Sequence, residues 1–565
     1  MYKNNIENEI KQPLLYIFMV FILASISYEM YTNQKVLTII IVSAFFIMFI
    51  MYKKIIITMI IVLFYLMALI NNNLYYNYKA DEKEEIRIIK LSEYEVLGKI
   101  DGRKVELDIE RGNIKLGSRI EAKGKYSRDI NTDKGIVGTY NIKEYIELKH
   151  DYLYKLYRKR DNIFNDISKK IGFRKAALIS AMAFGYKDEL DTGDNESLRE
   201  IGVAHAIAVS GLHMALIYGF ISNIFGWKIA LIIGFIYMMF TGASPSTTRA
   251  YIMILVMSFG KVTKRNYNQL SALSLAGIII LFLKPYSAKE LGFLLSFLAT
   301  LGIIMFNKKI NRKLYKLPNK IRESISLSIS TQIFTFPITV LYFNEISIIF
   351  LIGNLIVVPF ILMIVVMGNI ILVFSKIRIV FNYLLFICDY IIDIIDWILF
   401  YFEEIGINTI YLDYIVVYMY IGFMITYYFY IKGYKRVIYY PIISLIYVMI
   451  LVYSPVVNIQ YYREGALLIS YRGERVIVQT ARKINEEKIK SICMTNDIKK
   501  DIDKIYIGNN IIIENVDGNY ILKVENKRYI LKVNYNKIKS KYDIIDFRNG
   551  NIRKVIVYSD NIIIR

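Results

Sequence analysis

The chain has 565 residues, a mean hydropathy of +0.38, 55% hydrophobic residues and 21% charged residues. These values exclude an ordinary soluble protein, because several apolar runs exceed the roughly 18 residues that indicate a membrane span. The formal net charge of +22 fits an acidic polymer or anionic lipid as partner, and it fits the lysine-rich cytoplasmic loops of membrane proteins equally well. The composition predicts a polytopic α-helical membrane protein.

Three apolar runs open the chain, at residues 13–31, 36–52 and 55–70. The first resembles a signal peptide, but two more runs follow it closely, so we expect it to stay as a membrane anchor. Lys53 and Lys54 place the second turn in the cytoplasm by the positive-inside rule. Residues 1–70 are therefore predicted to form three transmembrane helices with a cytoplasmic N-terminus.

Residues 71–172 change character, with charges every few residues and an alternation of apolar and polar side chains. Alternation with period two indicates β-strands, and glycine-bearing turns separate them at Asp101-Gly102, Arg111-Gly112 and Leu116-Gly117. Five short strands would suit an OB-like barrel. We expect this β-domain on the extracytoplasmic side.

Ten further apolar runs lie between residues 201 and 453, which gives about 11–13 membrane segments, some short enough to be re-entrant. Alternation of these segments puts three basic loops in the cytoplasm, at residues 261–265, 307–322 and 432–436. The same alternation puts the tail outside. Residues 173–454 are thus predicted to form a helical bundle, and residues 455–565 a small β-rich soluble domain.

The stretch HAIAVSGLHMAL at residues 205–216 carries polar groups inside an apolar segment. His205 and His213 would lie about 12 Å apart along an unbroken helix, too far to share a metal ion. A break at Ser210-Gly211 would change this spacing, because glycine lets the segment kink and turn carbonyls toward a ligand. The alternative interpretation is close helix packing with the imidazoles hydrogen-bonded across helices.

A membrane hydrolase is a competing hypothesis, with Ser210 as nucleophile and His213 as base. Intramembrane serine proteases use a G-x-S-G motif, whereas this chain has Ala208 at the first glycine position, and no third orienting group is evident. Metal hydrolysis is disfavoured because the sequence has no H-E-x-x-H or H-x-H-x-D-H cluster and His150 stands alone. We predict no metal and no cofactor.

Two further polar features lie in the predicted bundle. The guanidinium of Arg249 could form a fork to a phosphate, or it could cap a helix or reach the membrane interface. Asp389, Asp393 and Asp396 share one helical face, which favours an amphipathic helix with its acids in water over a proton relay.

Four separated motifs resemble the competence domain of the ComEC family. Members of that family are bacterial membrane channels that admit one DNA strand to the cytoplasm during natural transformation. These motifs are LREIGVAHAIAVSGLHMALI, SPSTTRAYIM, GFLLSFLATLGI and the stretch from Asn354 to Pro359, and they occur in the family's order. The leading helices and the β-domain are similar to that family's N-terminal region. Longer members end in a metallo-β-lactamase-like domain, which the opening GALLISYRGERVIVQT of the tail resembles. No histidine follows this stretch in the tail, so the metal ligands of such a domain are missing. We therefore expect the tail to be a remnant of that domain or another small β-domain, without nuclease activity.

The resemblance implies a channel for single-stranded DNA, with the lipid bilayer around it and no catalytic residue. Because the sequence has no G-x-x-x-x-G-K-[ST] loop, a separate cytoplasmic ATPase motor would pull the strand, and a membrane-anchored receptor would deliver it. The predicted lining of the path is His205, Ser210, Gly211, His213, Arg249, Ser296, Asn344 and Asn354. The predicted structural residues of the motifs are Gly292, Phe293, Phe297, Pro337 and Pro359. Tyrosines of the β-domain could stack with bases, namely Tyr94, Tyr126, Tyr140 and Tyr145. A protein retained without transport activity is a further alternative.

Overall fold

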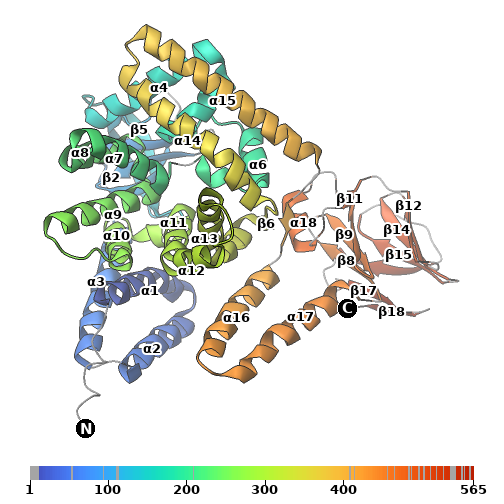
Figure 1. Ribbon diagram of the computed structural model, residues 1–565. Helices are drawn as coiled ribbons and strands as arrows, with labels where there is room; N and C mark the ends of the chain where they lie inside the picture. The colour runs from blue at the N-terminus through green and yellow to red at the C-terminus, as the bar shows by residue number, and fades with distance from the viewer. Residues whose placement is uncertain are drawn as a thin grey trace. The chain divides into compact units, whose positions relative to one another are not determined.

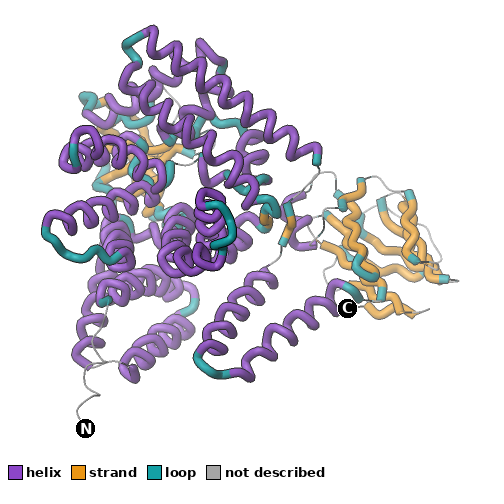
Figure 2. Tube along the Cα trace, in the orientation of Figure 1, coloured by secondary structure: helices purple, strands orange, loops and turns teal. Residues whose placement is uncertain are grey.

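The computed structural model describes residues 12–52, 55–92, 95–109, 114–207, 209–405, 409–412, 414–454, 456–462, 465–481, 484, 486–493, 495, 497–500, 503–508, 511–516, 518–525, 527–534, 542–548, 552, 554–558 and 561–564. The chain divides into two compact units. The first comprises Met1–Thr335 and Ile349–Ile407, and the second comprises Phe336–Ile348 and Asn408–Arg565. Figure 1 labels the elements, and Figure 2 shows most strands gathered in two regions of a largely helical chain.

Each of the three leading apolar runs forms a helix: α1 (Pro13–Asn33), α2 (Lys35–Tyr52) and α3 (Ile55–Tyr76). Pro13 begins α1, a position where its missing N–H removes no helical hydrogen bond. The hydroxyls of Ser27 and Tyr65 share a hydrogen bond of 2.8 Å between α1 and α3. Most apolar side chains of α2 are exposed, as expected of a helix that faces lipid rather than water.

The β-domain is a closed five-stranded barrel in the order β1-β2-β3-β5-β4. Its strands are β1 (Lys83–Leu91), β2 (Val96–Ile100), β3 (Arg103–Asp108), β4 (Arg119–Ser127) and β5 (Ile136–Glu147). The predicted five strands are all present, and β3 pairs with β5 in parallel while the other pairs are antiparallel. Asp101 and Gly102 both have positive φ, which gives the type I′ turn between β2 and β3. The predicted turn at Arg111-Gly112 lies outside the described residues.

The barrel ends before the predicted boundary at residue 172. Asp151 caps a following helix, α4 (Tyr152–Ile171), by accepting the backbone N–H of Tyr154 at 3.0 Å. Two helices continue the chain, α5 (Phe173–Phe184) and α6 (Thr192–Glu200). Helix α5 packs in one apolar core with α14 (Phe350–Phe374) and α15 (Arg378–Glu404). Gly368 permits this packing, because a Cβ there would lie 2.5 Å from the Cβ of Ala183.

A run of apolar helices forms the middle of the first unit, and the last of them continues into the second unit from Phe336. These are η1 (Ala204–Ala206), α7 (Gly211–Phe225), α8 (Trp227–Phe240), α9 (Pro245–Val262), α10 (Gln269–Leu283), η2 (Pro285–Lys289), α11 (Leu291–Gly302), the π-helical η3 (Ile303–Asn307), α12 (Lys308–Lys313) and α13 (Asn319–Phe343). Gly277 lets α10 meet α1, since a Cβ there would lie 2.1 Å from the ring of Phe18. Helices α1, α3, α10 and α11 share a second apolar core.

Five helical stretches among the described residues are long and apolar enough to cross a membrane: Pro13–Tyr31, Ile57–Tyr76, Leu291–Lys313, Asn319–Phe343 and Phe350–Phe374. Five apolar helices of 10–17 residues accompany them: Lys35–Met51, Gly211–Phe225, Trp227–Phe240, Gln269–Leu283 and Ile415–Ile431. A helical membrane protein with β-domains is therefore confirmed. The sequence predicts more membrane segments, about 11–13, than the five helices that meet the length and apolarity criteria.

The second unit contains two more apolar helices and the tail. The helices are α16 (Tyr414–Ile431) and α17 (Tyr439–Val452), with η4 (Lys435–Ile438) between them. Two short strands of this unit, β6 (Glu345–Ile346) and β7 (Ile410–Tyr411), pair with each other in antiparallel orientation. The basic loop predicted at residues 432–436 falls between α16 and α17.

The tail forms two sheets that share an apolar core. One sheet contains β11 (Ile498–Lys499), β10 (Glu474–Gln479), β9 (Ala466–Tyr471), β8 (Val457–Tyr462), β17 (Lys554–Tyr558) and β18 (Asn561–Ile564), in that order. The other contains β12 (Lys504–Ile507), β13 (Ile511–Val516), β14 (Asn519–Val524), β15 (Lys527–Lys532) and β16 (Asp543–Asp546). Helix α18 (Glu486–Cys493) lies in the chain between β10 and β11.

Candidate functional site

The apolar run that begins at residue 201 is not one helix. Gly202, with φ of +79°, ends α6, and the N–H of Val203 bonds the carbonyl of Leu198 at 2.9 Å. A single 3-10 turn follows, and Ser210 is extended, with φ of −110° and ψ of 173°. Helix α7 then begins at Gly211. Non-helical backbone at membrane depth is tolerated where protein surrounds it or where it lines a watery cavity, so this break is a candidate site.

Ser210 and His213 form the N-terminal cap of α7. The hydroxyl of Ser210 accepts the N–H of Leu212 at 3.2 Å, and Nδ1 of His213 accepts the backbone N–H of Ser210 at 3.4 Å. His213 thus replaces the usual Glu or Gln of a capping box. Neither contact is the hydrogen bond between serine hydroxyl and imidazole that a nucleophile and its base require. His205, in contrast, is exposed on the 3-10 turn.

Arg249 lies on the second turn of α9, against the start of α7. A Cβ on Gly211 would lie 2.7 Å from Nη2 of Arg249, so the guanidinium occupies the space where another residue would have a side chain. Nε of Arg249 donates to the hydroxyl of Ser296 on α11 at 2.8 Å, and that hydroxyl donates to Ser246 at 3.1 Å. We call Ser210, Gly211, His213, Arg249 and Ser296 the arginine cluster. Three helices that are separate in the sequence meet in it.

The arginine cluster holds a cation with neutral partners. Besides Ser296, Arg249 contacts the sulfur of Met253, 3.6 Å from Nη1. No carboxylate in the part of the chain that the structure describes forms an ion pair with this guanidinium. Buried and membrane-embedded cations usually have a counter-charge or mark a functional path. The site is therefore suited to a transient anionic ligand.

The aromatic residues of the third motif hold α11 in place. Phe293 and Phe297 are buried and stack with ring centroids 4.1 Å apart, and Phe18 of α1 lies 5.5 Å from Phe297. Gly292 is exposed, and a Cβ there would have no other atom within 4 Å. These contacts anchor the helix that presents Ser296 to Arg249.

Asn354 and Pro359 lie on α14, which passes the turn before the break. A Cβ on Gly353 would come within 2.4 Å of the carbonyl oxygen of Ile201, so α14 and this turn are in direct contact. The Oδ1 atom of Asn354 is buried, with no hydrogen-bond partner among the described residues. Pro359 sits inside α14 and removes one helical hydrogen bond.

Two predicted site residues belong to the second unit. Pro337 lies inside α13, and Asn344 ends that helix with a left-handed φ of +55°. The carbonyl of Asn344 accepts the N–H of Leu412 at 2.8 Å, next to the pairing of β6 with β7. The contact of Asn344 is a backbone hydrogen bond within that unit. Neither Pro337 nor Asn344 is one of the residues that make up the arginine cluster.

The candidate base-stacking tyrosines of the barrel differ in exposure. Tyr140 is wholly buried, and its hydroxyl donates to backbone carbonyls, among them Glu82 at 2.9 Å, so the expectation that it stacks with bases is wrong. Tyr126 is half-buried and donates to Val137 at 2.7 Å. Tyr145 is 38% exposed and available for stacking, and Tyr94 lies outside the described residues.

The acidic face of α15 forms ion pairs with α5. Lys175 of α5 contacts both Asp389 and Asp393 at 2.6 Å. Arg174 forms a fork to Asp396, with one distance of 2.7 Å, and also binds Asp194 of α6. These ion pairs fasten α15 to α5, and the carboxylates keep contact with solvent, Asp393 with 58% of its side chain exposed. Among the described residues no group of three or more His, Cys, Asp and Glu is placed to hold a metal ion.

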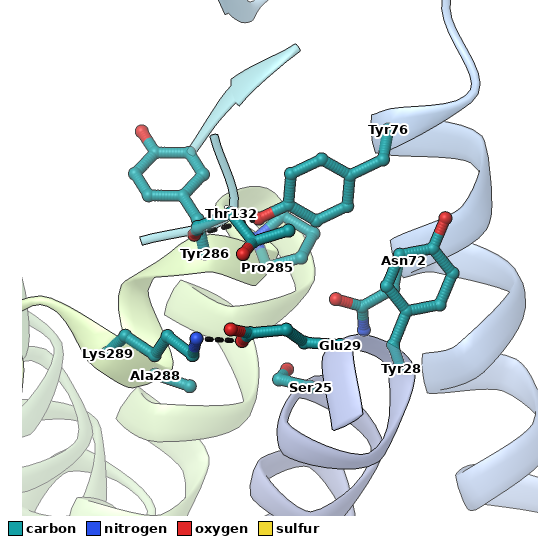
Figure 3. Close-up of a pocket in the computed structure, with 10 residues that line it drawn as sticks. All are labelled: Ser25, Tyr28, Glu29, Asn72, Tyr76, Thr132, Pro285, Tyr286, Ala288 and Lys289. Atoms are coloured by element: carbon teal, nitrogen blue, oxygen red, sulfur yellow. Dashed lines mark hydrogen bonds and ion pairs between the residues drawn. The ribbon is translucent and has the colours of Figure 1, made fainter. Parts of the chain in front are cut away.

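A junction between the barrel and the helices was not predicted. Figure 3 shows Lys289 of η2 pointing to Glu29 of α1, with which it forms an ion pair. Lys289 also contacts Asp133, in the loop between β4 and β5, at 2.9 Å. The rings of Tyr28 and Tyr76 stack beside this pair with centroids 5.6 Å apart. The loop, α1 and η2 are far apart in the sequence, so no local pattern marks the contact.

A second set of contacts completes the junction. Lys104 of β3 pairs with Glu290 at 3.0 Å, and its ammonium lies 4.0 Å from the ring centroid of Tyr286. That ring packs on Tyr75 and against Gly135, where a Cβ would lie 2.3 Å from it. Ion pairs and aromatic contacts together fix the barrel on the end of the helical bundle.

The profile of the Competence protein family matches residues 182–436. The centre of this chain is therefore similar to that family. All of the predicted path-lining and structural motif residues lie inside this competence domain, whereas the barrel with its candidate tyrosines and the tail lie outside it. The predicted resemblance to the ComEC family is confirmed.

Curated relatives share the same region at low identity. ComE operon protein 3 of Bacillus subtilis (strain 168) is 23% identical over 254 residues, 43% of this chain and 32% of the relative. Recombination protein 2 of Haemophilus influenzae is 25% identical over 212 residues, 33% of this chain and 27% of the relative. An uncharacterized protein of Aquifex aeolicus is 24% identical over 218 residues, 37% of this chain and 51% of the relative. The matches thus cover about half or less of the relatives' lengths. No solved structure matches. The competence domain and the apolar helices make the chain a membrane protein.

Proposed function

We propose that this protein conducts single-stranded DNA across the bacterial cytoplasmic membrane during natural transformation. The observation that carries this proposal is the arginine cluster, a guanidinium held by neutral groups at a break in an apolar segment. A polyanion cannot cross hydrocarbon, so its path must be wet and polar-lined. The names of the relatives, ComE operon protein 3 and Recombination protein 2, agree with a role in handling DNA.

The arginine cluster suits a moving phosphate chain. Arginine presents a planar fork that matches phosphate oxygens, and here Ser296 orients the fork through Nε while Nη2 faces the start of α7. A permanent carboxylate partner would compete with each passing phosphate. Hydroxyl partners hold the side chain without neutralising it, which allows binding weak enough for release.

The barrel would receive the strand on the extracytoplasmic side. We propose an OB-type barrel, because its order β1-β2-β3-β5-β4 with a parallel β3–β5 pair closes five strands as that fold does. OB-folds bind single strands by basic grooves and stacked bases. The exposed ring of Tyr145 is the candidate platform.

The remaining assignments follow from charge and motifs. The basic loops between helices would lie in the cytoplasm with the N-terminus, and the barrel and tail outside. A membrane-anchored receptor would deliver the DNA and a cytoplasmic ATPase would pull it, since the sequence carries no phosphate-binding loop for nucleotide. The tail would be a small β-domain without nuclease activity. The alternative of a serine hydrolase is not favoured, because capping occupies Ser210 and His213.

Uptake of labelled DNA tests the proposal. Cells that lack the gene should bind duplex DNA outside but accumulate no labelled strand in the cytosol, and the gene in trans should restore it. Arg249→Gln should restore insertion into the membrane but only a small part of the transport. Unchanged cytosolic accumulation in the deletion strain would refute the proposal.

A further inference from the structure

Four cationic side chains lie side by side in a row across four neighbouring strands of the barrel. Arg119 of β4 is directly opposite Arg87 of β1, Arg87 is opposite Lys99 of β2, and Lys99 is opposite Lys104 of β3. Residues directly opposite on paired strands point to the same face. Gly98 and Ile100, which flank Lys99, face the interior, so the four cations line the outer face. Like charges in such a row repel, so the row needs anions.

The chain itself supplies anions to three of the four. Arg119 pairs with Glu85, Arg87 pairs with Asp151, and Lys104 pairs with Glu290. Lys99, between the last two pairs, has no hydrogen-bond or ion-pair partner among the described residues, although it is only partly exposed. Nη1 of Arg87 is also buried without a partner among them. The centre of the row therefore has two donor groups, Lys99 and Nη1 of Arg87, without a hydrogen-bond partner among the described residues.

The helical bundle adds a fifth cation at the same place. Lys284 follows α10, and its charge acts on Lys99 together with those of Lys104 and Arg87. The ammonium of Lys284 donates to the carbonyl of Ala243 at 3.3 Å. Ala243 leads into α9, whose second turn carries Arg249. Through Lys284 and Ala243, the cationic centre therefore adjoins the start of the helix that carries Arg249.

We propose that Lys99, flanked by Lys104, Arg87 and Lys284, binds a phosphodiester group of single-stranded DNA where the strand passes from the barrel to the helices. This inference rests on the proposed function. A linear polyanion fits better than a lipid headgroup, because neighbouring strands are about 4.8 Å apart and the row therefore extends over about 14 Å. A single lipid headgroup would contact only one end of the row.

Binding of an oligonucleotide to the full-length protein in detergent tests the site. Anisotropy of a fluorescein-labelled 20-mer of deoxythymidine would be measured from 50 to 300 mM NaCl. Loss of one phosphate contact should weaken binding about fivefold at 0.1 M salt and lower the salt slope by about 0.7. We expect this for Lys99→Gln, whereas Lys99→Arg should bind like the wild type. Lys125→Gln, an exposed lysine on β4, is the matched control and should change little.

Equal affinity and equal salt slope for Lys99→Gln and Lys125→Gln would overturn the site. Vesicles containing phosphatidylglycerol form the second arm: if Lys99→Gln weakens binding to them and leaves oligonucleotide binding intact, the ligand is lipid and the proposal fails. Transport separates this result from the proposed function. Normal oligonucleotide binding by Lys99→Gln with lost transport in Arg249→Gln refutes the lysine site alone. Lost binding in Lys99→Gln with normal transport in Arg249→Gln refutes the path through the arginine cluster and leaves the lysine site.

Discussion

The imidazole of His213 accepts the backbone N–H of Ser210 through Nδ1, across 3.4 Å. This contact decides how the only Ser-His pair in the broken segment is used. The imidazole fixes the backbone where α7 begins, and the hydroxyl accepts the N–H of Leu212. A pair that was open to interpretation as a hydrolytic site thus has a structural task, which is to hold the break next to Arg249.

Removal of the N-terminal cap of α7 should lower the thermal stability of the protein, and we expect no enzymatic activity to be lost with it. Ser210→Ala loses one N-cap hydrogen bond, which typically costs about 1 kcal/mol, so the apparent melting temperature in detergent should fall. Ser222→Ala, in the interior of α7, is the control and should melt like the wild type. A fluorophosphonate probe should not label either the wild type or the variant. Labelling that disappears in Ser210→Ala would instead favour the hydrolase.

The absence of a side chain at Gly211 is a specific requirement of the arginine cluster. In Gly211→Ala the new methyl group would lie 2.7 Å from Nη2 of Arg249, so the guanidinium must move away from Ser296. We expect DNA transport to fall at least fivefold at normal membrane levels. Gly219→Ala, in the same helix with no atom within 4 Å of its Cβ position, should transport normally. Equal transport by the two variants would contradict the arrangement.

Charge and geometry at Arg249 can be separated. Arg249→Gln removes the charge and should lower transport about tenfold or more, as expected for loss of a charge-assisted hydrogen bond of roughly 1.5–3 kcal/mol. Arg249→Lys keeps a charge but loses the Nε donor to Ser296, so an intermediate rate is expected. Arg265→Gln, in the exposed loop after α9, is the control. Rates for Arg249→Lys equal to those of the wild type would show that the fork is not needed.

Binding of DNA at the barrel should depend on pH near 8. Burial, and then the charges of Lys284, Lys104 and Arg87, lower the pKa of Lys99 to about 8, against a smaller opposite effect of Glu290. Lys99 is therefore charged at pH 7 and neutral at pH 9, and affinity for the oligonucleotide should fall as the pH rises through 8. Lys99→Arg should abolish this fall, because arginine stays charged. The same fall in Lys99→Arg would assign it to another group.

The junction between barrel and helices should depend on Gly135. This residue has φ of +70°, and a Cβ would lie 2.3 Å from the ring of Tyr286. Gly135→Ala should therefore loosen the barrel, and limited proteolysis should cut faster between the barrel and the bundle. Gly102→Ala carries similar backbone strain at φ of +81° with no atom near its Cβ, so it controls for strain alone. Similar cutting of both variants would mean that the Tyr286 contact does not hold the barrel.

The sequence predicted elements well where a local pattern was enough. Period-two alternation gave the five strands of the barrel, and Ser210-Gly211 marked the break before α7. It failed where partners are distant. The acids of α15 meet a lysine 214 residues away, which no window of sequence reveals. Tyr140 alternates like its neighbours, and only closure of the barrel shows that it points inward. The cationic row needs the strand register, which hydrophobic patterns do not specify for outward-facing residues.

The start of α7 at Gly211 has one more consequence for the arginine cluster. The first turn of a helix carries a partial positive charge of about half an elementary charge, from amide groups that no helical carbonyl accepts. Helix α7 begins at Gly211, beside the guanidinium of Arg249. The electric field at the cluster therefore has a backbone contribution that neither mutation of Arg249 nor alkaline pH removes. For this reason, Arg249→Gln should retain a small residual rate of transport rather than none.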